Sequence, residues 1–141
     1  MDTDNIVETL TYQHRQLQTD LGKISELFLK PDQNVVDISS LLKQFSLDLV
    51  QHLHIENEVF YVELLRKMKE KGKDTAKTEL FISEMDKIGK AVMMFLGSYD
   101  SEEKIKNALD VFKNDLSSIT ETLNLRIESE EEGVYTYWKS L

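Results

Sequence analysis

Apolar residues recur at spacings of three and four in four long segments of the chain. Side chains at these spacings lie on one face of an α-helix, so each segment predicts a helix with an apolar face. The predicted helices cover residues 4–29, 36–71, 75–96 and 101–138, with residue 74 as an alternative start for the third. No segment shows the alternation of a β-strand, so the expected fold class is all-α.

Helix-breaking residues separate these segments. Pro31 cannot continue a helix, Gly72 suits a helix C-cap, and Ser101 precedes acids in the manner of an N-cap. Short connections join only neighbouring helices. The sequence therefore predicts an antiparallel up-down-up-down four-helix bundle, which forms a single domain over residues 1–141.

The charge of the chain narrows the classes of partner. A formal net charge of −9 and a pI of about 4.8 predict a surface that repels phosphate backbones and anionic lipids. We therefore expect no nucleic-acid partner and no membrane partner. No apolar run approaches the roughly 18 residues of a spanning helix, and acids stand where a signal peptide carries basic residues. A cytoplasmic location is expected.

The chain has no cysteine, which excludes disulfides, thiolate ligands and cysteine nucleophiles. It also lacks a glycine-rich phosphate loop and a serine-nucleophile motif, so no other class of enzyme is supported. Any metal site would have to use imidazole and carboxylate groups.

The last predicted helix carries two charged residues on its apolar face. Arg126 and Glu130 continue the spacing of a stripe that otherwise contains Ile105, Leu109, Phe112, Leu116, Ile119, Leu123, Val134 and Tyr137. A buried charge without a partner is strongly destabilising. Both residues therefore require partners on other helices or a bound ion.

The stretch QHLHIENEVFY in the second predicted helix offers two pairs of histidine and glutamate. His52 and Glu56 lie one turn apart on the main apolar stripe, whereas His54 and Glu58 fall about 160° away from it. A second, partly apolar face contains the other pair. Helical spacing therefore favours His52 and Glu56 without excluding His54 and Glu58.

The first predicted helix carries His14 on its own apolar stripe. The bundle interior is thus expected to hold a polar cluster that consists of His14, His52, Glu56, Arg126 and Glu130. Helical bundles build iron or manganese sites from nitrogen and carboxylate ligands on several helices. A His-x-x-x-Glu pair presents both kinds of ligand on one face, so this cluster is a candidate metal site.

These residues resemble the ligand motifs of the hemerythrin-like family, also called the HHE cation-binding domain. That family carries a histidine on its first helix, HxxxEE on its second, a histidine on its third and a second HxxxEE on its fourth. TYQHRQL matches the first motif around His14, and HLHIENEVFYVEL matches the second if His52 and Glu56 are the ligands. RIESEEEGVYTYW aligns with the fourth through Glu130, so the resemblance covers nearly the whole chain.

The chain also departs from the family pattern. Asn57 replaces the second acid of the first HxxxEE, and Val62 replaces the proline that usually follows. Arg126 stands in the histidine position of the fourth helix. In the third helix Met85 stands where the histidine belongs, and Gly89 occupies the second position of the HxxxH found in oxygen carriers.

In the family, the histidines of the first two helices serve one iron, those of the last two serve the other, and the glutamates bridge. The resemblance therefore implies that one site is kept and the other lost. One interpretation is a single non-heme iron, or manganese or zinc, held by His14, His52, Glu56 and Glu130. Arg126 and Met85 would take the place of the second metal. Dioxygen, nitric oxide or peroxide would be the ligand of a sensor, storage or stress-response protein.

The other interpretation is a bundle without a cofactor, in which Arg126 bridges Glu56 and Glu130 and the protein acts in interaction or regulation. A heme bundle ranks third, with axial ligands among His14, His52, His54 and Met85, because it gives the carboxylates no role. Met85, Met93 and Met94 are also expected to pack in the core, since methionine fills irregular gaps.

Overall fold

The computed structural model describes residues 3–28 and 34–141, so the predicted break at Pro31 and the predicted end of the first helix at Leu29 lie outside the described residues. The described residues fold into helices without a strand. In chain order these are α1 (Ile6–Leu27), α2 (Val35–Ile55), the π-helix η2 (Glu56–Phe60), α3 (Tyr61–Glu70), α4 (Ala76–Ser98), α5 (Glu102–Lys106), α6 (Leu109–Glu132) and α7 (Val134–Ser140). None of these helices is long and apolar enough to span a membrane.

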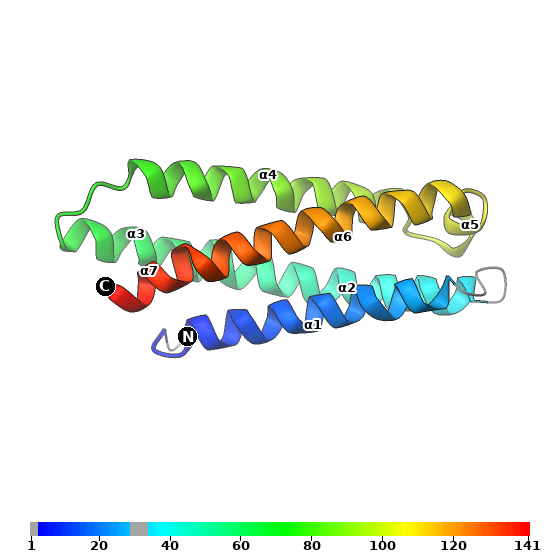
Figure 1. The fold of residues 1–141 in the computed structure, drawn as a ribbon, viewed down its shortest axis with the longest axis horizontal. Coiled ribbons are helices and arrows are strands. Elements are labelled where there is room, and N and C mark those ends of the chain that lie inside the picture. Colours follow the sequence, from blue (N-terminus) through cyan, green and yellow to red (C-terminus); the bar gives the residue numbers. More distant parts are fainter. Residues whose placement is uncertain (1–2, 29–33) are drawn as a thin grey trace.

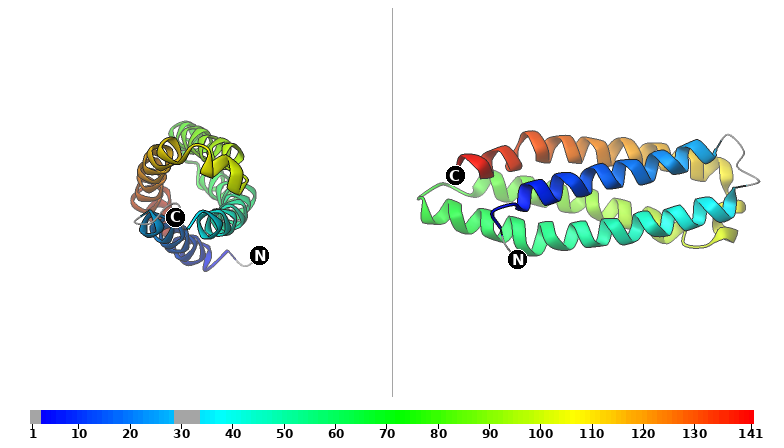
Figure 2. Two further views of the ribbon diagram at one scale, coloured as in Figure 1. Left: turned by 90° about the vertical axis from the view of Figure 1, so that its right-hand side faces the viewer. Right: turned by 90° about the horizontal axis from the view of Figure 1, so that it is seen from below.

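The helices assemble into long rods that lie side by side. α2, η2 and α3 follow one another directly and form one rod, and α6 continues into α7 at Gly133 (Figure 1). α1 and α4 each contact both of these rods, and successive rods run in opposite directions along the long axis (Figure 1). Seen end-on, the rods surround a common axis (Figure 2). The prediction of an all-α helical bundle is confirmed.

Local sequence signals account for two of the helix boundaries. Gly72 has a positive φ of 68°, and the amide of the next residue, Lys73, donates to the carbonyl of Met68 at 2.8 Å. This is the glycine-dependent termination predicted for the second segment. The Ser101 hydroxyl accepts a hydrogen bond from the Lys104 amide at 3.2 Å, so the predicted N-cap is confirmed as well.

The last segment is not the single helix over residues 101–138 that the sequence predicts. The backbone leaves helical geometry at Ala108, where φ is −141° and ψ is 41°, and α6 begins only after it. A second break occurs at Gly133, with φ −100° and ψ −97°. α7 therefore presents a different set of residues to the interior from the set that a continuous helix would present.

The orientation of α4 was predicted only in part. Met85 is buried as expected, Val92 and Phe95 are buried on the same helix, and Phe81 and Ile88 are half-buried. Two further predictions were wrong: Met93 and Met94 are 38% and 75% exposed, because they follow Val92 around the helix toward its outer side.

The apolar core consists of two clusters. The first fills the half of the bundle that contains α5, and its members are Leu17, Leu21, Ile24, Val35, Ile38, Leu42, Phe45, Leu49, Val92, Phe95, Leu96, Tyr99, Ile105, Phe112, Leu116, Leu123 and Ile127. The second lies toward the end that carries both termini, and its members are Ile6, Val7, Leu10, Phe60, Tyr61, Leu64, Met68, Val134, Tyr135 and Trp138. On each long rod except α4, buried polar residues lie between the stretches that contribute to the two clusters.

An acidic contact joins α1 to α2 outside this polar layer. Asp20 is 8% exposed, and one of its carboxylate oxygens accepts no hydrogen bond within the described residues. Burial and the neighbouring Asp48 raise the pKa of Asp20 to about 7, whereas Lys23 acts in the opposite direction. The folded protein therefore binds more protons here than the unfolded chain, so its free energy of unfolding falls as the pH rises from about 4 to about 7.

Asp20→Asn is expected to remove this pH dependence. The variant should be about 1–2 kcal/mol more stable than the wild type near pH 8 and similar to it near pH 4; solvent and Lys23 screen the carboxylate and limit the gain. Urea unfolding at the two pH values measures the difference. Glu26→Gln, on the exposed side of the same helix, is the control. A gain of equal size at both pH values would contradict the assignment.

Candidate metal centre

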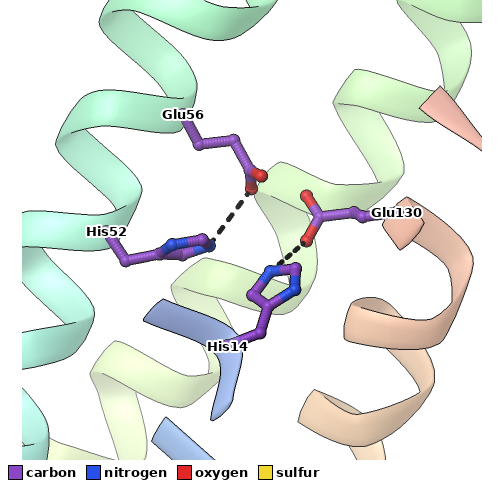
Figure 3. A group of neighbouring side chains, drawn as sticks. All are labelled: His14, His52, Glu56 and Glu130. Atoms are coloured by element: carbon purple, nitrogen blue, oxygen red, sulfur yellow. Dashed lines mark ion pairs between the residues drawn. The ribbon is translucent and has the colours of Figure 1, made fainter. Parts of the chain in front are cut away.

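Four side chains from three rods converge in the interior. His14 comes from α1, His52 from α2, Glu56 from η2 and Glu130 from α6, and Figure 3 shows them pointing toward one another. Each offers one nitrogen or oxygen atom that lies within 4.8 Å of the others, and each side chain is at most 2% exposed. The structure thus brings together all four ligands that the sequence predicts.

A π-helix positions Glu56 and the residues after it. In η2 the Tyr61 amide donates to the carbonyl of Glu56, which is five residues earlier, whereas in an α-helix the acceptor is four residues earlier. His52 and Glu56 lie on the inner face before this wider turn, which then directs both Phe60 and Tyr61 inward. Short π-helical turns are frequent at functional sites, because they shift the phase of one helix face against the other.

The outer nitrogens of both imidazoles contact hydrogen-bond acceptors. His14 Nδ1 lies 2.7 Å from a carboxylate oxygen of Glu131, and His52 Nδ1 lies 2.9 Å from the side-chain oxygen of Gln13. These contacts assign a hydrogen to Nδ1 in both rings, and in a neutral ring Nε2 then carries the lone pair. Such a contact on the outer nitrogen is the arrangement that orients metal-bound histidines.

The inner nitrogens face carboxylate oxygens. His14 Nε2 lies 3.3 Å from Glu130 Oε1, and His52 Nε2 lies 3.7 Å from Glu56 Oε1. When the rings are neutral, each contact sets a lone pair against an acceptor, which is unfavourable unless a cation or a proton lies between them. Glu130 Oε1 is buried and accepts no hydrogen bond within the described part of the chain. The donor set and this unsatisfied oxygen both fit a metal ion.

The ionisable groups have strongly shifted pKa values. Burial lowers the pKa of His52 to about 3, with a further contribution from His14, so this ring is neutral near pH 7. Burial and the adjacent Glu130 raise the pKa of Glu56 well above its usual value, although Arg126 opposes them. Burial alone would raise the pKa of Glu130 too, but interactions with Glu56, His14 and Arg126 hold it below its usual value.

Without a metal, Arg126 supplies positive charge to both carboxyl groups. Its guanidinium donates to Glu56 Oε1 and lies 3.4 Å from Glu130 Oε1, and the raised pKa of Glu56 favours proton uptake there over Glu130. A divalent cation would lower the pKa of Glu56, because it favours the ionised form of a carboxylate that binds it. Metal binding would thus oppose proton uptake at Glu56.

Comparison with known proteins identifies the family. The model of the hemerythrin HHE cation binding domain matches residues 5–138. The chain belongs to the hemerythrin HHE family. No curated protein and no solved structure matches it. The four buried candidate ligands lie on the helices where the HHE resemblance expects them, which are α1, the α2–η2–α3 rod and α6.

Arg126 lies beside the carboxylates in this HHE domain. Its Nη2 donates to Glu56 Oε1 at 2.6 Å, and its Nε lies 3.4 Å from Glu130 Oε1. Its Nη1 donates to the backbone carbonyl of Met85 at 2.8 Å. The Met85 side chain is buried in the core as predicted, and the carbonyl of Met85 accepts the hydrogen bond from the arginine. The two positions in which the chain departs from the HHE histidines are therefore in direct contact.

Gly89 makes room for this arginine. A Cβ atom built on Gly89 would lie 2.9 Å from Arg126 Nη1 and 3.7 Å from the side chain of Leu53. The sequence comparison had identified Gly89 only as a lost HHE ligand position. In the structure, the absence of a side chain allows the guanidinium to pack against the backbone of α4.

Two tyrosines at the site were not predicted. The Tyr61 hydroxyl donates to Glu130 Oε2 at 2.6 Å, and the Tyr135 hydroxyl donates to Glu56 Oε2. Burial, with the nearby Glu56 and Glu130, raises the pKa of both phenols above the usual value. The helical spacing of the last segment predicts Tyr137 on the inner face, but the break at Gly133 places Tyr135 there instead. The π-turn directs Tyr61 inward beside Phe60.

The pair that helical spacing disfavours lies outside the site. His54 and Glu58 are exposed, although each is only two residues from a buried member of the cluster. The sequence did not predict a role for Gln13 or Glu131, which contact the outer nitrogens of the two histidines. Their positions give a usable signal, since each directly adjoins a predicted ligand in the sequence.

Proposed function

We propose that this protein binds a single non-heme metal ion through His14, His52, Glu56 and Glu130. Iron is the first candidate, and manganese and zinc are the alternatives. We further propose that the rods form an up-down-up-down four-helix scaffold of the hemerythrin type. One observation carries the proposal: both imidazoles have Nδ1 held by acceptors while Nε2 faces a carboxylate oxygen.

Arg126 supports one metal ion instead of two. A guanidinium stays protonated and cannot coordinate a metal, and here it contacts both carboxylates that would otherwise bridge to a second ion. Its charge also offsets one of these carboxylates. Two imidazoles and two carboxylates suit iron, manganese or zinc.

We place the function among sensor, storage and stress-response proteins. Four protein ligands leave open positions on an iron ion, at which dioxygen, nitric oxide or peroxide would bind. The protein contributes a buried cluster between two apolar clusters. Hydrogen bonds fix the orientations of its two histidines, and hydrogen bonds from two tyrosines fix those of its two carboxylates. These contacts limit the access of water and hold the ligands in place before the metal binds.

A second candidate function rests on the same arginine. The hydrogen bonds from Arg126 to Glu56 and to the Met85 carbonyl already link α6, η2 and α4 without a metal. In this alternative the ionic cluster replaces the metal link, and the protein acts as an interaction or regulatory module. The contacts of Arg126 with both glutamates favour this alternative, because they already supply positive charge to the two carboxyl groups.

Elemental analysis distinguishes the two proposals. The protein is purified without a metal-affinity tag and measured before and after anaerobic incubation with ferrous iron. We expect about one metal ion per chain and its loss in His52→Ala. His54→Ala is the matched control, because it removes an exposed histidine two residues away and should leave the metal content unchanged. No bound metal under either condition would reject the metal site and support the second candidate.

A further inference from the structure

The hydroxyl of Tyr135 lies between two of the proposed ligands. Its oxygen is 3.3 Å from His14 Nε2, and it donates a hydrogen bond to Glu56 Oε2. The side chain is only 1% exposed. Its ring stacks on that of His14, with centroids 5.5 Å apart, and meets the ring of Phe60 edge-on. These ring contacts fix the phenol oxygen at the edge of the cluster.

Relative to His14 this oxygen has the spacing of a ligand, whereas its contact with Glu56 Oε2 is a hydrogen bond that coordination would replace. Nitrogen and oxygen donors that lie about 2.0–2.2 Å from one metal ion are about 3–3.5 Å from each other. The Tyr135 oxygen and Glu130 Oε1 are both 3.3 Å from His14 Nε2. The phenol oxygen is therefore as far from this nitrogen as the oxygen of Glu130, which is already a proposed ligand.

Tyr61 is the natural comparison, because it also donates to a carboxylate of the cluster and is equally well buried. Its hydroxyl contacts Glu130 Oε2, the oxygen that also faces Arg126 Nη2 at 3.4 Å. It thus lies on the side of the guanidinium, whereas the Tyr135 hydroxyl lies on the side of the imidazoles. The two tyrosines occupy different environments despite their similar hydrogen bonds.

We infer that Tyr135 is a fifth metal ligand and binds as a phenolate beside His14, His52, Glu56 and Glu130. The inference rests on the proposed function. Coordination breaks the phenol O–H bond, forms an oxygen–metal bond and releases one proton to solvent, and no electron is transferred in this step. Three anionic oxygen donors favour ferric over ferrous iron, because hard donors prefer the higher charge. The site would then hold iron in the ferric state, which suits storage or sensing better than reversible oxygen carriage.

Spectroscopy of matched variants tests the inference. Wild type, Tyr135→Phe and Tyr61→Phe are loaded with ferrous iron without oxygen and then oxidised with dioxygen. The wild type should develop a visible tyrosinate-to-iron charge-transfer band whose resonance Raman spectrum contains tyrosine ring modes. Tyr135→Phe should lose this band and bind iron at least about tenfold more weakly, whereas Tyr61→Phe should keep the band. Circular dichroism verifies that each variant is folded, and ring-deuterated tyrosine in the wild type gives an independent test.

The outcomes separate this inference from the proposed function. Iron bound at the four-residue site without a tyrosinate band would overturn the role of Tyr135 and leave the metal site standing. A band that persists in Tyr135→Phe and disappears in Tyr61→Phe would also overturn it. If His52→Ala and the wild type alike bind no metal, both proposals fail together.

Discussion

Arg126→Met is expected to lower the free energy of unfolding of the metal-free protein by about 3–5 kcal/mol. The arginine is buried, and its guanidinium donates to Glu56 at 2.6 Å and to the Met85 carbonyl at 2.8 Å. Methionine fills much of the same volume but supplies no donor and no charge. Glu130 would then lose its compensating cation, and the Met85 carbonyl would lose its hydrogen bond.

Urea unfolding in the presence of a chelator measures this loss. Arg15→Met is the control, because Arg15 also pairs with a glutamate, Glu131, but is 52% exposed, so its loss should cost less than about 1 kcal/mol. Equal losses in the two variants would contradict a central role for Arg126. A bound metal ion should reduce the loss in Arg126→Met, because it supplies another positive charge to the same carboxylates.

Gly89→Ala is expected to destabilise the protein by about 1–3 kcal/mol, the usual range for overpacking. The new methyl group would lie 2.9 Å from Arg126 Nη1. The end of an arginine side chain can often move away from such a contact, but this one is held by hydrogen bonds to two other helices. Relief of the clash would therefore weaken those bonds. Thermal or urea unfolding measures the effect.

Gly97→Ala on the same helix is the matched control. A Cβ atom at Gly97 meets nothing within 4 Å, so alanine should be neutral or stabilise the helix by up to about 1 kcal/mol. The Gly89 substitution is then repeated in the Arg126→Met background. Its cost should largely disappear there, since methionine has no Nη1 atom to clash with. A cost that persists would assign the effect to the backbone of α4 instead of the arginine.

Helical spacing was sufficient to select the histidine and the glutamate that face the interior. His52 and Glu56 were preferred over His54 and Glu58 because they share a face with Leu49 and Phe45, and the structure buries the first pair and exposes the second. A regular 3.6-residue period holds up to Glu56. Burial of charged Arg126 followed from the same rule, because its stripe is otherwise apolar.

The parts that the sequence did not predict lie where the helical period changes. η2 alters the phase after Glu56, which brings Tyr61 inward, and Gly133 alters it after Glu130, which brings Tyr135 inward. Helix propensities cannot predict the position of a π-turn, because its residues are also found in ordinary α-helices. The space at Gly89 was equally hidden, because it depends on a contact between α4 and α6 that is remote in sequence.

The position of the polar cluster between two apolar clusters has a consequence for cooperativity. Neither apolar cluster shares its buried members with the other, so ionic and hydrogen-bonded contacts form much of the connection between the two halves of the bundle. The half that contains α7 and the N-terminal part of α1 can open while the other half keeps its core, and amide hydrogen exchange would register this as two levels of protection. Whatever binds at the cluster therefore also sets how far the two halves unfold as one unit.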